Sequence, residues 1–106
     1  MSSSIIALLR KEQLTGENYA TWKLKLNMIL VITDLHFVLM EECPFPTQNA
    51  SQSVKDAYDY WTKENDKADV YILASMSDML SKKYEIVVTA HQIMDSLIEM
   101  FGQLSI

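Results

Sequence analysis

Apolar residues recur at steps of three and four positions along most of this chain, and this spacing is the strongest constraint on its fold. It is the period of an α-helix that buries one face, whereas a half-buried strand alternates at every second residue. The 106 residues include only two glycines and two prolines. Sheet proteins use such residues at short intervals to turn the chain. The sequence therefore predicts one all-α domain, a compact bundle of about five helices.

The first clear helix is expected to begin near Asn18, whose side chain can accept a hydrogen bond from a first-turn amide. Its buried stripe consists of Tyr19, Trp22, Leu26, Ile29 and Leu30. A break near Thr33 and Asp34 is expected to cap a second, short helix. The inward residues of that helix are Leu35, Val38 and Leu39. It must end before Pro44, because proline has no amide hydrogen and disfavours helix in the preceding residue. A loop is therefore predicted at residues 44–49.

A long helix is predicted from about Ser51. Its core-facing positions keep the helical spacing, and Asn65 is the one polar exception among them. They are Val54, Ala57, Tyr58, Trp61, Asn65, Ala68, Ile72 and Met76. At the other end of the chain, residues 5–14 fit either a short helix or an extended arm. We therefore expect an N-terminal arm over residues 1–13 and a helical domain over residues 14–106.

Two further helices are predicted after the long one. The first is expected to be capped by Asp78 and to end in the β-branched run 86–88, which weakens helix preference. Its inward residues are Met79, Leu80, Tyr84 and Val87. Thr89 and Gln92 then form a capping box for the last helix, in which each side chain pairs with a backbone amide of the other residue. Gly102 is expected to stop that helix in a left-handed conformation. The apolar stripe of the last helix is Ala90, Ile93, Met94, Leu97, Ile98 and Phe101.

The charge balance limits the partners of the chain. Nine Lys and Arg against fourteen Asp and Glu give a formal net charge of -5. Such a chain repels a phosphate backbone, so direct nucleic-acid binding by this segment is not expected. Cys43 is the only cysteine, which fits a reducing compartment, and we expect a cytoplasmic location. The apolar-rich stretch 24–40 is interrupted by polar residues and falls short of the ~20 apolar residues that span a bilayer, so no membrane contact is expected.

No group of residues suggests catalysis, and the chain is predicted not to be an enzyme. No nucleophile is paired with a base and an orienting group. His36 and His91 lie far apart without acidic residues at ligand spacing around both, so no metal or cofactor is expected. We expect His36 on a helix face and His91 exposed in a first turn. Cys43 is expected in a loop, where the neighbouring Glu41 and Glu42 would raise the pKa of its thiol.

Three segments together carry a family pattern. They are LTGENYATWKLKLNMIL from residue 14, YDYWTKENDKADVYILASMSDML from residue 58 and VVTAHQIMDSLIEMFG from residue 87. Their order and spacing resemble the N-terminal part of the Gag polyprotein of plant copia-type LTR retrotransposons. That family has a Gly-x-Asn-Tyr-x-x-Trp opening, a Trp-containing helix that ends in a small-residue turn, a Thr-Ala helix start and a Leu-x-x-x-Phe close. The match covers roughly residues 14–101.

The resemblance implies an all-helical fold like a capsid N-terminal domain, without catalytic residues. By position it implies scaffold roles for Tyr19, Trp22, Trp61, Ala68, Ala90, Leu97 and Phe101. Leu26 joins this core scaffold through its place in the first stripe. Members of the family usually continue for another helical half, and many then carry a Cys-Cys-His-Cys zinc knuckle that grips RNA. We therefore expect this sequence to hold the first half of the family unit. Met94 departs from the pattern, because the family often has tryptophan there.

The resemblance favours a non-enzymatic Gag-derived domain that self-associates, either in capsid-type assembly or as a dimeric remnant of it. Helix 90–101 has more apolar residues than one buried stripe needs. The candidate self-association residues are Met94, Ile98 and Met100. The expected partners are further copies of the chain and full-length Gag. The alternative is a monomeric adaptor or regulatory domain that binds a helix or peptide of another protein.

Overall fold

The computed structural model describes residues 2–15, 17–87 and 89–101, which form six α-helices and one isolated bridge. The helices are α1 (Ser2–Lys11), α2 (Tyr19–Ile32), α3 (Phe37–Met40), α4 (Gln52–Ala74), α5 (Asp78–Tyr84) and α6 (Ala90–Phe101). The predicted all-α fold is confirmed. The helix beyond the expected five is α1, in the segment whose structure the sequence left open.

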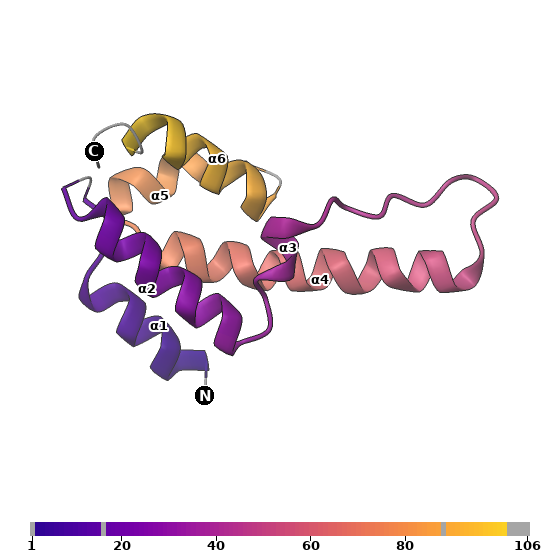
Figure 1. Cartoon of the computed structure of the whole chain (residues 1–106), viewed down its shortest axis with the longest axis horizontal. Coiled ribbons are helices and arrows are strands. Elements are labelled where there is room, and N and C mark those ends of the chain that lie inside the picture. Colours follow the sequence, from indigo (N-terminus) through magenta and orange to yellow (C-terminus); the bar gives the residue numbers. More distant parts are fainter. Residues whose placement is uncertain (1, 16, 88, 102–106) are drawn as a thin grey trace.

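The 23-residue helix α4 is the axis of the molecule (Figure 1). Helices α1, α3, α5 and α6 all contact it. The second half of α4 lies among the other helices, whereas its first half projects beyond them, with the 41–51 segment running alongside (Figure 1). This projection gives the molecule an elongated outline, 47 Å along its longest axis and 23 Å along its shortest.

One hydrophobic core receives side chains from all six helices. Helix α2 enters it through large side chains, and one of them makes a buried polar contact as well. The indole Nε1 of Trp22 donates a hydrogen bond to the carbonyl oxygen of Ser75 at 3.0 Å. The Leu14 amide donates to the same oxygen at 2.9 Å, next to a parallel bridge between Leu14 and Met76. The Ser75 carbonyl therefore ties α2 and the segment before it to the turn between α4 and α5.

The N-terminal segment, expected as an arm over residues 1–13, is helical from residue 2 to residue 11. Helix α1 packs against α4, and Leu9 is only 3% exposed within the common core. After the helix, the Glu12 carboxylate lies 3.5 Å from the Lys25 ammonium group on α2. The segment is thus packed onto the same body as residues 14–101.

Two predicted helix starts are confirmed in atomic detail. The hydroxyl of Ser51 accepts a hydrogen bond from the Val54 amide at the start of α4. At α6, the Thr89 hydroxyl accepts from the Gln92 amide at 3.1 Å, and the Gln92 side chain accepts from the Thr89 amide at 3.3 Å. These two bonds are the predicted capping box.

The other predicted caps are wrong, because the side chains bond elsewhere. Asn18 precedes α2, but its Oδ1 accepts from the Thr15 amide at 3.0 Å and so serves the turn before the helix. The Thr33 hydroxyl donates back to the Ile29 carbonyl at 2.8 Å. Asp34 takes a left-handed conformation with φ 61°. The next helix, α3, begins only at Phe37, after His36.

The cap of α5 is also displaced by one residue. The Ser77 hydroxyl, rather than Asp78, accepts the hydrogen bond from the Leu80 amide. Met79 was predicted to face inward but is 85% exposed, because this short helix is covered on one side only. The Gly102 prediction lies outside the described residues.

The stripe predicted for α4 is buried only from Trp61 onward. Val54 and Ala57 keep the helical spacing but are exposed. They belong to the first turns of α4, which project beyond the other helices (Figure 1). A side chain on this part of α4 has no neighbouring helix to pack against.

Candidate functional site

The structure brings the only cysteine and one histidine to the same small hollow, which Cys43 and His91 line together with Glu41 and Glu42. Within the described part of the chain, no three His, Cys, Asp or Glu residues lie close enough to hold a metal ion. His36 is half-buried before α3, and His91 is exposed and lies 3.6 Å from Asp95. Cys43 is half-buried in the loop, where burial raises the pKa of its thiol. The sequence predicted the same direction but assigned it to the neighbouring carboxylates.

The predicted scaffold residues lie in the core. Seven of them are no more than 6% exposed: Tyr19, Trp22, Leu26, Trp61, Ala68, Ala90 and Leu97. Phe101, the eighth, is half-buried and lies at the edge of the core, where its ring centroid is 5.8 Å from that of Tyr19. This contact joins the end of α6 to the start of α2.

The predicted self-association residues of α6 do not form one surface. Met94 is 5% exposed and belongs to the core, as its place in the apolar stripe predicted, so it offers no surface for self-association. Met100 is half-buried, and Ile98 is 43% exposed. The exposed neighbours of Ile98 on this helix include the carboxylates Asp95 and Glu99. Helix α6 therefore offers a single exposed aliphatic side chain among charges, rather than an apolar patch.

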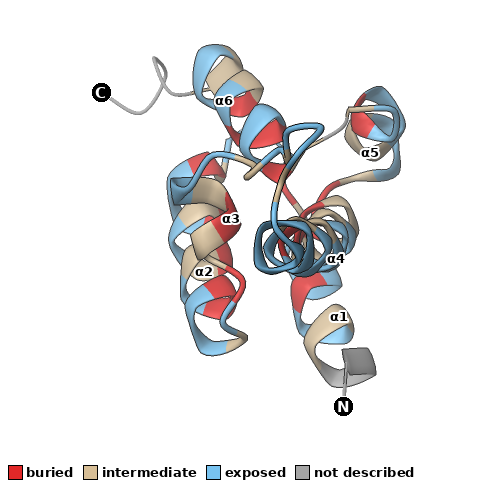
Figure 2. Cartoon of the chain, turned by 90° about the vertical axis from the view of Figure 1, so that its right-hand side faces the viewer, coloured by how far each residue is buried: buried red, intermediate tan, exposed pale blue. Residues whose placement is uncertain are grey.

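A continuous apolar surface is present instead on α2. Four large side chains of this helix are at least 57% exposed: Leu24, Met28, Val31 and Ile32. At 100° per residue they lie on the side opposite the buried stripe. Figure 2 shows α2 at the edge of the molecule, with its buried positions turned toward the other helices. We call these four residues the α2 outer face.

The lysines beside the α2 outer face are held by their own chain. Lys25 pairs with Glu12, and the Lys23 ammonium group lies 5.9 Å from the centre of the Tyr19 ring. The remaining exposed residues on the outer side of α2 are the uncharged Ala20 and Thr21. The α2 outer face is therefore both apolar and free of charge.

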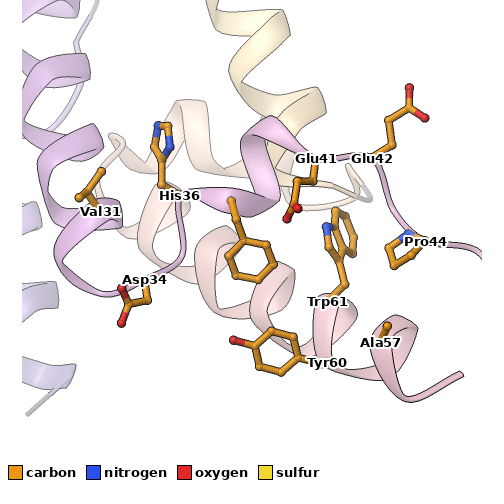
Figure 3. A pocket seen from close by; sticks show the side chains of 10 residues that line it. Val31, Asp34, His36, Glu41, Glu42, Pro44, Ala57, Tyr60 and Trp61 are labelled. Atoms are coloured by element: carbon orange, nitrogen blue, oxygen red, sulfur yellow. The ribbon is translucent and has the colours of Figure 1, made fainter. Parts of the chain in front are cut away.

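A groove lies where α3 meets the projecting part of α4 (Figure 3). Its volume is about 680 Å³. It is lined by Val31, Asp34, His36, Phe37, Glu41, Glu42, Pro44, Ala57, Tyr60 and Trp61. A smaller hollow of about 290 Å³ shares Glu41, Glu42 and Trp61 and reaches the start of α6. We call the larger hollow the acidic groove.

The aromatic residues of the acidic groove come from two helices. The Phe37 and Tyr60 rings stack with centroids 5.8 Å apart and planes 7° apart. Trp61 is 6% exposed, and its Nε1 is buried without a hydrogen-bond partner among the described residues. A buried N–H without an acceptor costs about 1–3 kcal/mol. Figure 3 shows the nitrogen-bearing edge of this ring on the side of Glu41.

Neither surface was predicted from the sequence, although the α2 outer face has a recognisable pattern there. Every residue of the α2 outer face is visible in the sequence, and a helix that is apolar on both sides normally has two contacts to make. The acidic groove left no comparable pattern. Its residues come from α2, α3, the loop and α4, and only the fold brings these segments together.

Comparison with known proteins assigns no relative to this chain. No family model matches it, and neither a curated protein nor a solved structure matches it. Within the described residues, no helix is both long and apolar enough to cross a bilayer. Function therefore has to be inferred from the surfaces of the chain itself.

Proposed function

We propose that this chain is a non-enzymatic interaction domain that self-associates through the α2 outer face. The observation that carries the proposal is the exposure of Leu24, Met28, Val31 and Ile32 on a helix whose opposite side is already buried. Contiguous apolar surface of this kind on a protein usually marks an interface.

A second copy of the chain is the occupant that suits this face best. Symmetric pairing brings one face onto its own equivalent, so charges of a single sign on that face would meet like charges across the contact. The α2 outer face has no charge, and the flanking Lys23 and Lys25 are engaged within the chain. Two such faces can therefore approach without like-charge repulsion. Helix α2 has 14 residues, or roughly 21 Å of length along which two copies could pack.

The wider proposal is a Gag-derived, capsid-like domain. It is supported by the order of the three segments that resemble copia-type Gag and by the all-α fold. On this proposal the chain would work in the cytoplasm and would pair with its own copies or with full-length Gag. The net charge of -5 disfavours direct RNA capture by this segment.

The test is a measurement of mass against concentration, by light scattering or analytical ultracentrifugation. The natural chain should grow in mass as its concentration rises. The double variant Leu24→Glu, Met28→Glu should remain a monomer with unchanged helical circular dichroism. Both side chains are exposed, so the fold tolerates the change, whereas charges would repel across a two-fold contact.

The matched control is Ile98→Glu, Met100→Glu on α6, which adds the same charge to the helix that the sequence had favoured. It should associate like the natural chain. A natural chain that stays monomeric at high concentration would refute self-association. A control that becomes monomeric, while the α2 variant still associates, would return the contact to α6.

A further inference from the structure

The acidic groove carries three carboxylates and one histidine, His36, without a Lys or Arg to balance the carboxylates. Asp34, Glu41 and Glu42 line it, and no Lys or Arg does. None of the three has an ion-pair partner among the described residues. Like charges gathered around one hollow create a field that attracts the opposite charge from solution. The groove therefore favours a positively charged occupant and disfavours nucleic acid.

The wall of the groove favours a flat cation. Tyr60 stacks against Phe37 on one side and is 57% exposed, so its outer face is open to solvent. A guanidinium group is planar and stacks on an aromatic face, and its N–H groups form a fork that matches a carboxylate. An ammonium group has neither the plane nor the fork. The combination of ring and carboxylates thus discriminates arginine from lysine.

The Trp61 indole adds a donor that lacks an acceptor. Its Nε1 is buried at the groove and has no hydrogen-bond partner in the described part of the chain, whereas the other tryptophan, Trp22, donates to the Ser75 carbonyl. Buried donors in native proteins nearly always have a partner. Because Nε1 is buried, a main-chain carbonyl of a bound peptide could accept this hydrogen bond only after a small movement beside Glu41, the side toward which the nitrogen-bearing edge turns in Figure 3.

From these three features we infer that the acidic groove binds an arginine-bearing peptide segment of a partner protein. The guanidinium stacks on Tyr60 and pairs with Glu41 or Glu42, and a peptide carbonyl accepts from Trp61. A metal ion fits less well, because the described residues hold no metal-binding group and a metal would leave the ring and the indole unused. The inference goes beyond self-association. Val31 belongs to both surfaces, but neither Leu24 nor Met28 lines the groove, so the self-association variant leaves the groove residues unchanged.

The test is a nuclear magnetic resonance titration of the whole chain with a short Gly/Ser peptide that contains two arginines. The Trp61 indole N–H signal should move and saturate, while the hydrogen-bonded Trp22 signal stays in place. The same peptide with lysine in place of arginine should bind about tenfold more weakly. A third peptide, with citrulline, keeps the shape of arginine but loses its charge and should not bind.

The matched variants are Glu41→Gln, Glu42→Gln in the groove and Glu85→Gln, Glu99→Gln away from it. All four side chains are exposed, and both pairs change the net charge equally. The groove pair should weaken arginine-peptide binding about tenfold, and the distant pair should leave it nearly unchanged. Equal weakening by both pairs, equal affinity for the lysine peptide, or an unmoved Trp61 signal would overturn the inference.

Discussion

Asp69 on α4 is a carboxylate held where its charge is poorly solvated. Its Oδ1 is buried without a hydrogen-bond partner among the described residues, and its Oδ2 accepts a long bond of 3.4 Å from Asn65. Burial, and then the nearby Asp66, raise the pKa of Asp69 to about 7. The folded chain therefore keeps a proton on Asp69 at pH values where the unfolded chain has lost it.

This shift predicts a stability change with pH. A folded-state pKa above the unfolded value favours the fold at low pH, and the advantage is lost as the pH rises from about 4 through about 7. Asn mimics the neutral acid, so Asp69→Asn should stabilise the chain at pH 8 by roughly 1–2 kcal/mol, after allowance for solvent at this partly buried group. Near pH 4 the gain should vanish. Urea denaturation at both pH values measures the difference.

An equal gain from Asp69→Asn at pH 4 and pH 8 would show that Asp69 titrates normally. The control is Asp59→Asn, an exposed position on the same helix, where no comparable gain is expected.

The start of α6 is capped from two directions. Its own capping box joins Thr89 and Gln92, and the Asn65 side chain on α4 accepts a hydrogen bond from the buried Ala90 amide at 3.0 Å. Asn65 was the polar exception in an otherwise apolar stripe. The first amides of a helix have no acceptor within the helix. Asn65 lies in the core because its side chain accepts from one of these amides, that of Ala90.

The two caps should differ in energetic weight. Thr89→Ala removes a partly exposed cap and should cost about 1 kcal/mol. Asn65→Ala leaves the buried Ala90 amide without this acceptor and opens space in the core, so it should cost about 2–4 kcal/mol. Chemical denaturation of each variant gives both values. If Asn65→Ala lowers the free energy of unfolding no more than Thr89→Ala does, the hydrogen bond from α4 is not the main interaction that stabilises the start of α6.

At the scale of elements, much of the fold could be predicted from the sequence. The start of α4 followed from apolar spacing, and the start of α6 followed from a local signal, because the capping threonine and its glutamine partner lie within three residues. The caps predicted at Asn18 and Asp78 were wrong, because several polar residues precede each of these helices and more than one of them can provide the capping side chain. The exposure of Val54 and Met79 could not be read from periodicity, which tells which residues share a face but not whether another helix covers it.

At the scale of the molecule, the projecting part of α4 sets the shape. The radius of gyration is 14.8 Å, against roughly 13 Å for a compact domain of this size. The acidic groove lies where this projection leaves the body, and the α2 outer face adjoins it through Val31, which lines the groove. Neither surface could be predicted as a site from the sequence, because each depends on which helices meet and which stay apart.

The double hydrogen bond at the Ser75 carbonyl has a consequence for how the chain opens. Amides outside helices usually exchange their hydrogen with solvent quickly, through small local fluctuations. Leu14 lies outside the helices, yet its amide is bonded to Ser75 beside the Trp22 indole, and its side chain is fully buried. The Leu14 amide can exchange only when its contact with Ser75, in the turn after α4, breaks. We expect the Leu14 amide to exchange as slowly as that of Ile72 in α4, measured by native-state hydrogen exchange.

The neighbouring Thr15 amide, bonded to the Asn18 side chain in an exposed turn, should exchange far faster. Similar rates for Leu14 and Thr15 would show that the contact at Ser75 opens by itself. If the two rates differ as expected, the turn at Thr15 opens locally, whereas the contact between Leu14 and Ser75 opens only when the whole chain unfolds. Helix α1 can then unfold and refold while Leu14 stays bonded to Ser75.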